Sequence, residues 1–176
     1  QIYQKAPNKL LMVVTGPDGA VTYQGFNGSA GWIKTPTQQR ELTSIELAQV
    51  KRQADLYKEL NLKDQFSNLI VGNNQKVNDR DAYVVVGTNS SKQRERLFFD
   101  AETGLLVRRV VFNQTILGLD PVQTDFSDYR EVDGVRLPFT ITISSLDNNH
   151  NGQTRTFLQI KQNVAVDDAK FEPPPK

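Results

Sequence analysis

Hydrophobic and polar residues alternate with a period of two along much of the chain. For example, Phe139, Ile141 and Ile143 alternate with hydroxyl-bearing residues, as in a strand with one dry and one wet face. This alternation and the abundance of Val, Ile, Phe, Tyr and Thr predict a series of strands. The predicted strands are residues 10–14, 20–26, 82–87, 94–100, 105–115, 124–132, 135–145 and 154–164.

Turn residues separate these strands and leave only short connections. Asn27-Gly28 and Asp133-Gly134 are typical of tight hairpins, because Asn, Asp and Gly accept positive φ angles. Comparable turns are expected at Pro17-Asp18-Gly19, Thr103-Gly104 and Asn151-Gly152. Short hairpin connections join antiparallel neighbours, so the pattern predicts an antiparallel meander and a mainly β (α+β) fold.

Residues 43–60 depart from this pattern and predict a helix. Thr43 and Glu46, three residues apart, fit a capping box at its start. The apolar stripe at helical spacing consists of Leu47, Val50, Ala54 and Tyr57. A helix with one apolar stripe must cover something apolar, so we expect it to pack on a sheet face.

Two stretches of strand, residues 83–86 and 105–107, are apolar on both faces. Two explanations remain open. The helix and loops cover the second face, or that face lines an apolar cavity for a ligand.

Composition excludes several classes of function. The 176 residues suit a single domain, and 21 basic and 20 acidic residues are well mixed, which argues against binding to nucleic acid or to an anionic membrane surface. Cysteine is absent, so disulfides and thiolate metal sites are excluded. No run approaches the ~20 apolar residues of a transmembrane segment. Because the chain opens on Gln1 rather than Met, we interpret it as a trimmed or mature fragment.

No set of residues converges on a reaction. Asp100 and Glu102 lie beside Gly104 between two apolar runs, which predicts a hairpin corner rather than an acid–base pair. The single histidine, His150, lies in a polar loop without partner ligands for a metal. We therefore predict no enzymatic activity, no metal and no cofactor.

Five stretches, in order along nearly the whole chain, resemble the outer-membrane lipoprotein-sorting (LolA-like) family, and more narrowly its uncharacterised envelope branch. They are "YQKAPNKLLM", "YQGFNGSAGW", "FFDAETGLLVRR", "DFSDYREVDGVRLPFTI" and "VAVDDAKFEPP". The resemblance implies a strongly curved antiparallel sheet, or incomplete β-barrel, with a helix across its concave face. It also implies a place in the periplasm or cell envelope. Such relatives usually have a helix and a strand before the first stretch, so we expect residues 1–176 to form one N-terminally truncated LolA-like domain.

Two functions follow as expectations. The first is a carrier that binds an acyl chain, another hydrophobic ligand or a lipidated protein on the concave face. The second is an envelope interaction or sensor module that binds a protein partner at an exposed sheet edge, with no small ligand. Alternation selects the lining residues of the first function as Met12, Tyr83, Val85, Leu97, Phe99, Phe139, Ile141, Ile143, Leu158 and Ile160.

Overall fold

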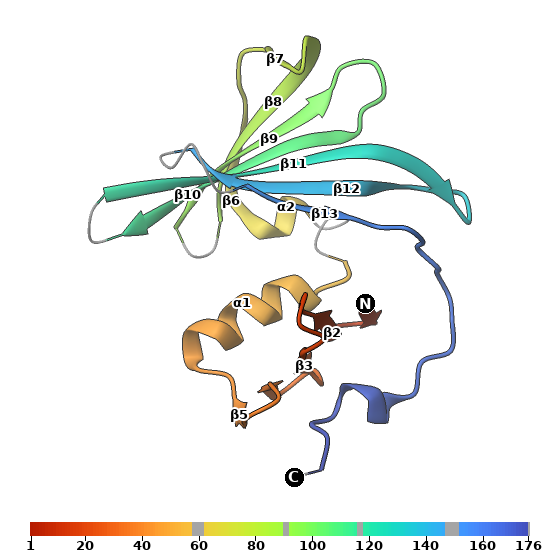
Figure 1. Cartoon of the computed structure of the whole chain (residues 1–176). Helices are drawn as coiled ribbons and strands as arrows, with labels where there is room; N and C mark the ends of the chain where they lie inside the picture. Colours follow the sequence, from red (N-terminus) through yellow and green to blue (C-terminus); the bar gives the residue numbers. More distant parts are fainter. Residues whose placement is uncertain (58–61, 90–91, 116–117, 147–151, 176) are drawn as a thin grey trace. The chain divides into compact units, whose positions relative to one another are not determined.

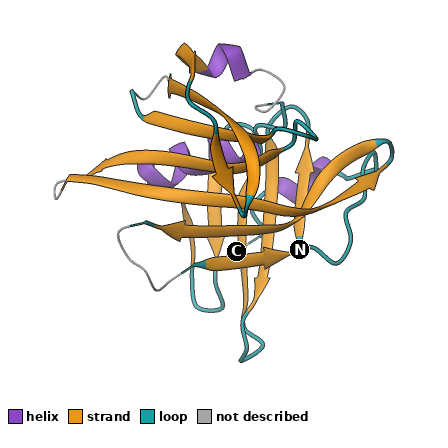
Figure 2. Ribbon diagram, turned by 90° about the horizontal axis from the view of Figure 1, so that it is seen from above, coloured by secondary structure: helices purple, strands orange, loops and turns teal. Residues whose placement is uncertain are grey.

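The computed structural model describes residues 1–57, 62–89, 92–115, 118–146 and 152–175. The chain forms two compact units, of which the first comprises Gln1–Leu62 and Val164–Lys176 and the second Lys63–Asn163. Each unit contains one β-sheet (Figure 1), and strands with few helices make up the structure (Figure 2). The strand pairs in the described residues are all antiparallel, which confirms the predicted fold class.

The sheet of the first unit has five strands, which lie side by side in chain order. They are β1 (Ile2–Lys5), β2 (Lys9–Thr15), β3 (Val21–Phe26), β4 (Gly31–Lys34) and β5 (Gln39–Glu41). The predicted turns at Gly19 and Gly28 connect β2, β3 and β4, and both glycines have positive φ angles, of 80° and 104°. The sequence pattern does not predict β1, β4 and β5, because three or four residues are too few for alternation to stand out.

The helix α1 (Ser44–Ala54) begins where the sequence predicts. Thr43 Oγ1 accepts a hydrogen bond from the Glu46 amide (3.4 Å), and the Glu46 carboxylate accepts one from the Thr43 amide (2.8 Å). This is the predicted capping box. Arg40 also donates two bonds of 2.8 Å to the same carboxylate. The bonds from Arg40, and then those from Thr43, lower the pKa of Glu46 to about 2.

The prediction that this helix reaches residue 60 is wrong. α1 ends at Ala54, and Asp55 has extended backbone angles. The Asp55 carboxylate accepts a hydrogen bond from the Tyr57 amide (2.9 Å), and this local bond competes with continuation of the helix. Tyr57 is consequently exposed rather than packed on a sheet. Residues 58–60 lie outside the described part of the chain.

α1 packs on one face of the five-stranded sheet, as the apolar stripe predicts. Val50 and Ala54 are fully buried, in a cluster with Leu10 and Phe26. Partly buried residues complete this cluster: Met12, Leu42 and Leu47.

The other face of the same sheet is covered by the C-terminal segment. A short 3₁₀-helix, η1 (Asp168–Phe171), brings Phe171 into a buried cluster with Leu11 and Trp32. Trp32 Nε1 donates a hydrogen bond to the Phe171 carbonyl (2.9 Å). The Trp32 ring lies so close to Gly25 that a Cβ there would be 2.3 Å from Trp32 Cε2. The five-stranded sheet is therefore buried on both faces by parts of its own unit.

The sheet of the second unit has eight strands in the order β13-β12-β11-β10-β9-β8-β6, with β7 also paired to β8. Its first three strands along the chain are β6 (Phe66–Val71), β7 (Gln75–Val77) and β8 (Arg80–Asn89). The others are β9 (Arg94–Asp100), β10 (Leu106–Thr115), β11 (Gly118–Val132), β12 (Val135–Ser145) and β13 (Gln153–Thr156). The four-residue helix α2 (Leu62–Gln65) precedes β6. β13 and β6 lie at opposite edges, so the sheet is not closed into a barrel.

The predicted strand over residues 154–164 is correct only at its start. β13 ends at Thr156, and one further bond joins the Phe157 amide to the Phe139 carbonyl (2.8 Å). The backbone then leaves the sheet edge, and Leu158 is 93% exposed. The alternation of Leu158 and Ile160 therefore does not reflect a strand.

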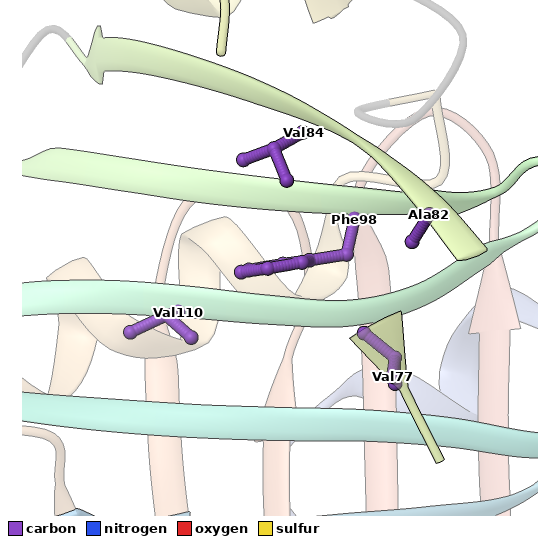
Figure 3. Packing of buried hydrophobic residues seen from close by; sticks show 5 residues of the cluster. All are labelled: Val77, Ala82, Val84, Phe98 and Val110. Atoms are coloured by element: carbon purple, nitrogen blue, oxygen red, sulfur yellow. The ribbon is translucent and has the colours of Figure 1, made fainter. Parts of the chain in front are cut away.

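One face of the eight-stranded sheet holds a buried apolar cluster. Figure 3 shows its five buried members, which are Val77, Ala82, Val84, Phe98 and Val110. Val77 comes from the short strand β7, and the others come from β8, β9 and β10. Partly buried residues extend this cluster: Val86, Val107 and Phe112.

Candidate functional site

The acidic residues near position 100 form a hairpin corner, as predicted. Asp100 Oδ1 accepts hydrogen bonds from the Thr103 amide (2.8 Å) and from Thr103 Oγ1 (2.7 Å), and Gly104 has a φ of 71°. Arg80 Nε donates to Asp100 Oδ2 (2.7 Å), and Arg80 also pairs with Glu102 (2.8 Å). The bond from Arg80, and then those from Thr103, hold the pKa of Asp100 well below its usual range. The carboxylate is thus committed to the turn.

Two further observations concern metal binding and membrane insertion. In the described residues, no group of three or more acidic or histidine side chains could hold a metal ion. Within that same part of the chain, no helix is long and apolar enough to cross a membrane. His150 lies outside the described residues.

The second face of the eight-stranded sheet, which we name the apolar face, lies opposite the buried cluster because neighbouring residues of a strand point to opposite sides. Strand pairing arranges its side chains in three rows. The first row consists of two paired sets, Tyr83, Phe99 and Leu106 on β8 to β10, and Phe126 and Ile141 on β11 and β12. The second contains Val71, Val85, Leu97, Arg109, Thr124 and Ile143. The third contains Leu69, Gly87, Glu95, Val111, Val122 and Ser145.

Strand pairing brings seven of the ten predicted lining residues onto this one face. Six belong to the first two rows: Tyr83, Val85, Leu97, Phe99, Ile141 and Ile143. The seventh, Phe139, precedes Ile141 by two positions on β12 and has the Arg130 guanidinium 4.4 Å from its ring centre.

The other three predicted residues lie elsewhere. Met12 belongs to the first unit, where it packs in the cluster beneath α1. Leu158 and Ile160 follow the end of β13.

The apolar face is only partly buried. Among the apolar side chains of its three rows, all of them described, Leu97 alone is buried. Four others are exposed by more than a third of their surface: Leu69 (37%), Val71 (75%), Tyr83 (49%) and Ile143 (42%). Large aliphatic and aromatic side chains gathered on one exposed face are typical of a ligand or partner surface.

Several residues of this face are missing from the sequence prediction. Val122 and Phe126 alternate with polar residues on β11, so a period-two count extended toward the start of that strand would find them. Leu106 and Val111 lie in a run that is apolar at almost every position, where alternation cannot assign a face. The sequence prediction also omits the strand β6, although the turn residues Gly72, Asn73 and Asn74 follow it directly.

A buried polar pair interrupts the apolar face. Glu95 is 2% exposed, and its Oε2 lies 2.7 Å from both Nε and Nη2 of Arg109. Its other oxygen accepts a hydrogen bond from Asn89 Nδ2 (2.8 Å). Gln93 donates from its side chain to Asn113 Oδ1 (2.8 Å) beside this pair. In the sequence, Arg108 and Arg109 lie between Val107 and Val110 of β10, and charged residues within an apolar run are a signal for buried partners.

Two surface hollows lie away from the predicted lining residues. One, of about 440 Å³ in the first unit, lies between Tyr3, Tyr23 and Trp32 on one side and the C-terminal prolines on the other. The other, of about 330 Å³ in the second unit, lies beside the hairpin corner at Asp100. None of the ten predicted lining residues borders either hollow. A ligand on the apolar face would therefore lie along the sheet surface.

Comparison with known proteins places this architecture. No protein-family model matches the sequence, and no curated protein matches it either. Several solved structures resemble it, and three of them illustrate the likeness. A LolA superfamily protein from Nitrosomonas europaea has a TM-score of 0.60 and 14% sequence identity, and the match covers 98% of this chain and 80% of that one. A DUF1329 family protein from Desulfovibrio piger has a TM-score of 0.59 and 15% identity, with 98% of this chain and 79% of that one covered. A putative outer-membrane lipoprotein-sorting protein domain from Vibrio parahaemolyticus has a TM-score of 0.52 and 12% identity, with 90% of this chain and 77% of that one covered. At these identities the likeness concerns the backbone architecture, and the chain therefore has a LolA-like fold.

Proposed function

We propose that this protein is a non-catalytic carrier of the periplasm or cell envelope, and that it binds an acyl chain on the apolar face of the eight-stranded sheet. One observation carries the proposal. This sheet is apolar on both faces, one face holds the buried cluster around Phe98, and the other leaves large side chains such as Tyr83 and Ile143 exposed. A sheet that served only as scaffold would present polar side chains on its second face.

The size of the face suits a long apolar chain. Its first two rows cross the strands from β8 to β12, and strands lie about 4.8 Å apart, so a row spans roughly 20 Å. An extended acyl chain of about sixteen carbons has a similar length. Each methylene removed from water contributes about 0.8 kcal/mol, so partial burial of such a chain offsets the loss of translational freedom on binding.

The fold supports the same proposal. Two of the similar structures are described as a LolA superfamily protein and a lipoprotein-sorting protein domain. Their descriptions concern those proteins, and they make a carrier role in the bacterial envelope the natural first hypothesis for this chain. The side chains of the apolar face include neither a nucleophile–base pair nor a metal site among the described residues, which suits binding without chemistry.

The test compares two aspartate variants at neighbouring positions of β12. Ile143→Asp places a charge on the apolar face, where Ile143 is 42% exposed and water can reach the carboxylate. Ser144→Asp places the same charge on the opposite face of the same strand, across from the neutral Gln123, and serves as the matched control. We expect Ile143→Asp to weaken binding of a fluorescent acylglycerol probe by about tenfold or more, with Ser144→Asp within about twofold of the unchanged protein.

Thermal unfolding of each variant establishes that it is folded. The proposal fails if the unchanged protein does not bind the probe. It also fails if the two variants weaken binding equally while both remain folded.

A second function, pairing with another protein strand, is favoured by the edge strand β6. Its six residues, Phe66–Val71, include no charge and no proline, although edge strands are usually protected by such residues. The Gly72 amide donates to the Val84 carbonyl (2.8 Å), so by alternation the backbone groups of Leu69 and Val71 point away from β8. Leu69, Ile70 and Val71 are also exposed.

The partner that this edge fits is a second copy of β6. In an antiparallel pair centred on Ile70, Leu69 of one chain would face Val71 of the other, and no like charges would meet. Analytical ultracentrifugation should detect a dimer that Ile70→Lys abolishes and Ser67→Lys retains. A monomer at all concentrations, or a dimer that Ile70→Lys leaves intact, would reject this second function.

A further inference from the structure

The pair formed by Arg109 and Glu95 has an unusual position for an ion pair. Arg109 lies in the middle of the second row, paired across the sheet with Leu97 on β9 and Thr124 on β11. The next residues along that row are Val85 and Ile143. A charged group therefore lies near the centre of a surface whose other side chains, apart from Glu95, Thr124 and Ser145, are apolar.

Only one side of this pair is accessible. The Glu95 side chain is 3% exposed, whereas that of Arg109 is 26% exposed. Glu95 is also fully engaged, because Oε2 accepts from Arg109 and Oε1 from Asn89. The carboxylate is thus held within the sheet, and the guanidinium is the part that a ligand on the apolar face would meet.

The guanidinium retains donors that the protein does not use. It has five N–H groups, and the contacts to Glu95 come from Nε and Nη2. In the part of the chain that the structure describes, Nη1 has no recorded partner. A donor near an apolar surface that is covered by ligand loses its water, so it must find an acceptor on the ligand.

The charge of the pair determines which acceptor fits. Glu95 already neutralises Arg109 at 2.7 Å, so the site as a whole has no net charge. A second carboxylate would be attracted by Arg109 and repelled by Glu95 at nearly the same distance. A neutral carbonyl oxygen takes the hydrogen bond without this repulsion and without the larger cost of removing a carboxylate from water.

We propose that Arg109 selects the linkage of the ligand, by donating a hydrogen bond to the carbonyl oxygen of the ester or amide that joins an acyl chain to its head group. The inference rests on the proposed acyl-chain function and names its ligand class. The ligand is an ester- or amide-linked acyl chain, as in an acylglycerol or a lipidated protein, rather than a free fatty acid. The apolar rows on both sides of Arg109 hold the chain, and Arg109 fixes its position along the face.

The ion pair itself supports a selective role. Replacing a buried ion pair by apolar residues often leaves a protein equally or more stable, so such a pair is a poor way to build an apolar surface. Leu or Val at position 109 would match the Leu97 and Val85 of the same row. A charged pair in that place has a purpose if the Arg109 donor that does not contact Glu95 binds an acceptor on the ligand.

The test uses two ligands that differ by one carbonyl group. 1-Monolauroylglycerol has an ester carbonyl, and 1-O-dodecylglycerol has the same head group and chain length joined by an ether. Displacement of a fluorescent acyl probe, below the concentrations at which the amphiphiles aggregate, gives both affinities. We expect the intact protein to bind the ester about tenfold more tightly than the ether, because a hydrogen bond from a charged donor has about that effect or more.

The variant removes both charges together. Arg109→Met alone would leave Glu95 buried and unpaired, and this could unfold the protein. The double variant Glu95→Met with Arg109→Met avoids this, and Asn89 keeps its 3.1 Å bond to Gln93 Oε1. We expect it to bind ester and ether equally, with ether affinity within about threefold of the unchanged protein.

Each outcome tests either the role of Arg109 or the carrier function on which that role rests. Equal binding of ester and ether by the intact protein, or an ester preference that survives in the folded double variant, overturns the role of Arg109 and leaves the carrier function standing. Laurate that binds more than about tenfold tighter than the ester at pH 8 also overturns it, because Arg109 would then be an anion site. If no acyl ligand binds at all, the carrier function fails first.

Discussion

Removal of the Phe171 side chain should strongly destabilise the first unit, although this residue lies only five positions from Lys176 in a short C-terminal segment. Phe171 is fully buried, and its neighbours are Leu11 and Trp32. A phenylalanine buries at least about 150 Å², which at about 25 cal/mol per Å² corresponds to roughly 4 kcal/mol. Phe-to-Ala changes in packed cores cost about 3–5 kcal/mol, in agreement with this value.

The structure offers a clean assay for this change. Trp32 is the single tryptophan of the sequence, and its indole donates to the Phe171 carbonyl, which Phe171→Ala retains. Urea unfolding followed by Trp32 fluorescence therefore reports on the packing that loses the side chain and leaves the hydrogen bond in place. We expect Phe171→Ala to reduce the free energy of unfolding by about 3–5 kcal/mol.

Leu158→Ala is the matched control, because Leu158 also lies in the C-terminal part of the chain but is 93% exposed. Its expected effect is below about 0.5 kcal/mol. A reduction below about 1 kcal/mol for Phe171→Ala, with an unchanged slope against urea, would refute the reasoning. It would mean that the C-terminal segment adds little to the stability of the sheet that it covers.

Three further predictions follow from the local geometry. Gly25→Ala should lower the melting temperature, because the new Cβ would be 2.3 Å from Trp32. Gly72→Ala is the control and should change the melting temperature little, because the atom nearest to its Cβ is 3.6 Å away. Equal melting temperatures for the two variants would contradict the close packing of Trp32 on Gly25. Glu46→Gln should lower the melting temperature at pH 6, and the difference from the unchanged protein should shrink as the pH falls from 4.5 toward 2, because a carboxylate with a lowered pKa stabilises the fold only while it is ionised. A difference that does not change with pH would show that the Glu46 charge is not its cause. Asp100→Asn should lower the melting temperature but leave acyl-probe binding within about threefold, and a large loss of binding in the folded variant would assign Asp100 a functional role.

Local chemistry makes several features predictable from sequence. The capping box at Thr43 and Glu46 and the corner at Asp100 and Gly104 depend on residues three or four positions apart. Such groups meet in any chain that folds locally, so the sequence pattern suffices to place them. β9 and β12 likewise match their predicted bounds, because long alternating runs need only an antiparallel neighbour to become strands.

The ends of two predicted elements depend instead on contacts that the pattern cannot express. α1 ends at Ala54 because the Asp55 side chain bonds to the Tyr57 amide, although the apolar spacing continues. β13 ends at Thr156 although Leu158 and Ile160 continue an alternation. An alternating sequence forms a strand only where a neighbouring strand remains within hydrogen-bonding distance.

By itself, therefore, the sequence determined the antiparallel class, most strands and turns, the start of the helix and which residues share a face within one strand. Tertiary structure decided how those faces combine. Strand register aligned Tyr83, Val85, Leu97 and Ile143 on one surface. Met12, by contrast, packs beneath α1 in the other unit. Strand register also set Arg109 beside Glu95 within an apolar row, and both outcomes depend on which residues pair across strands rather than on their spacing along the chain.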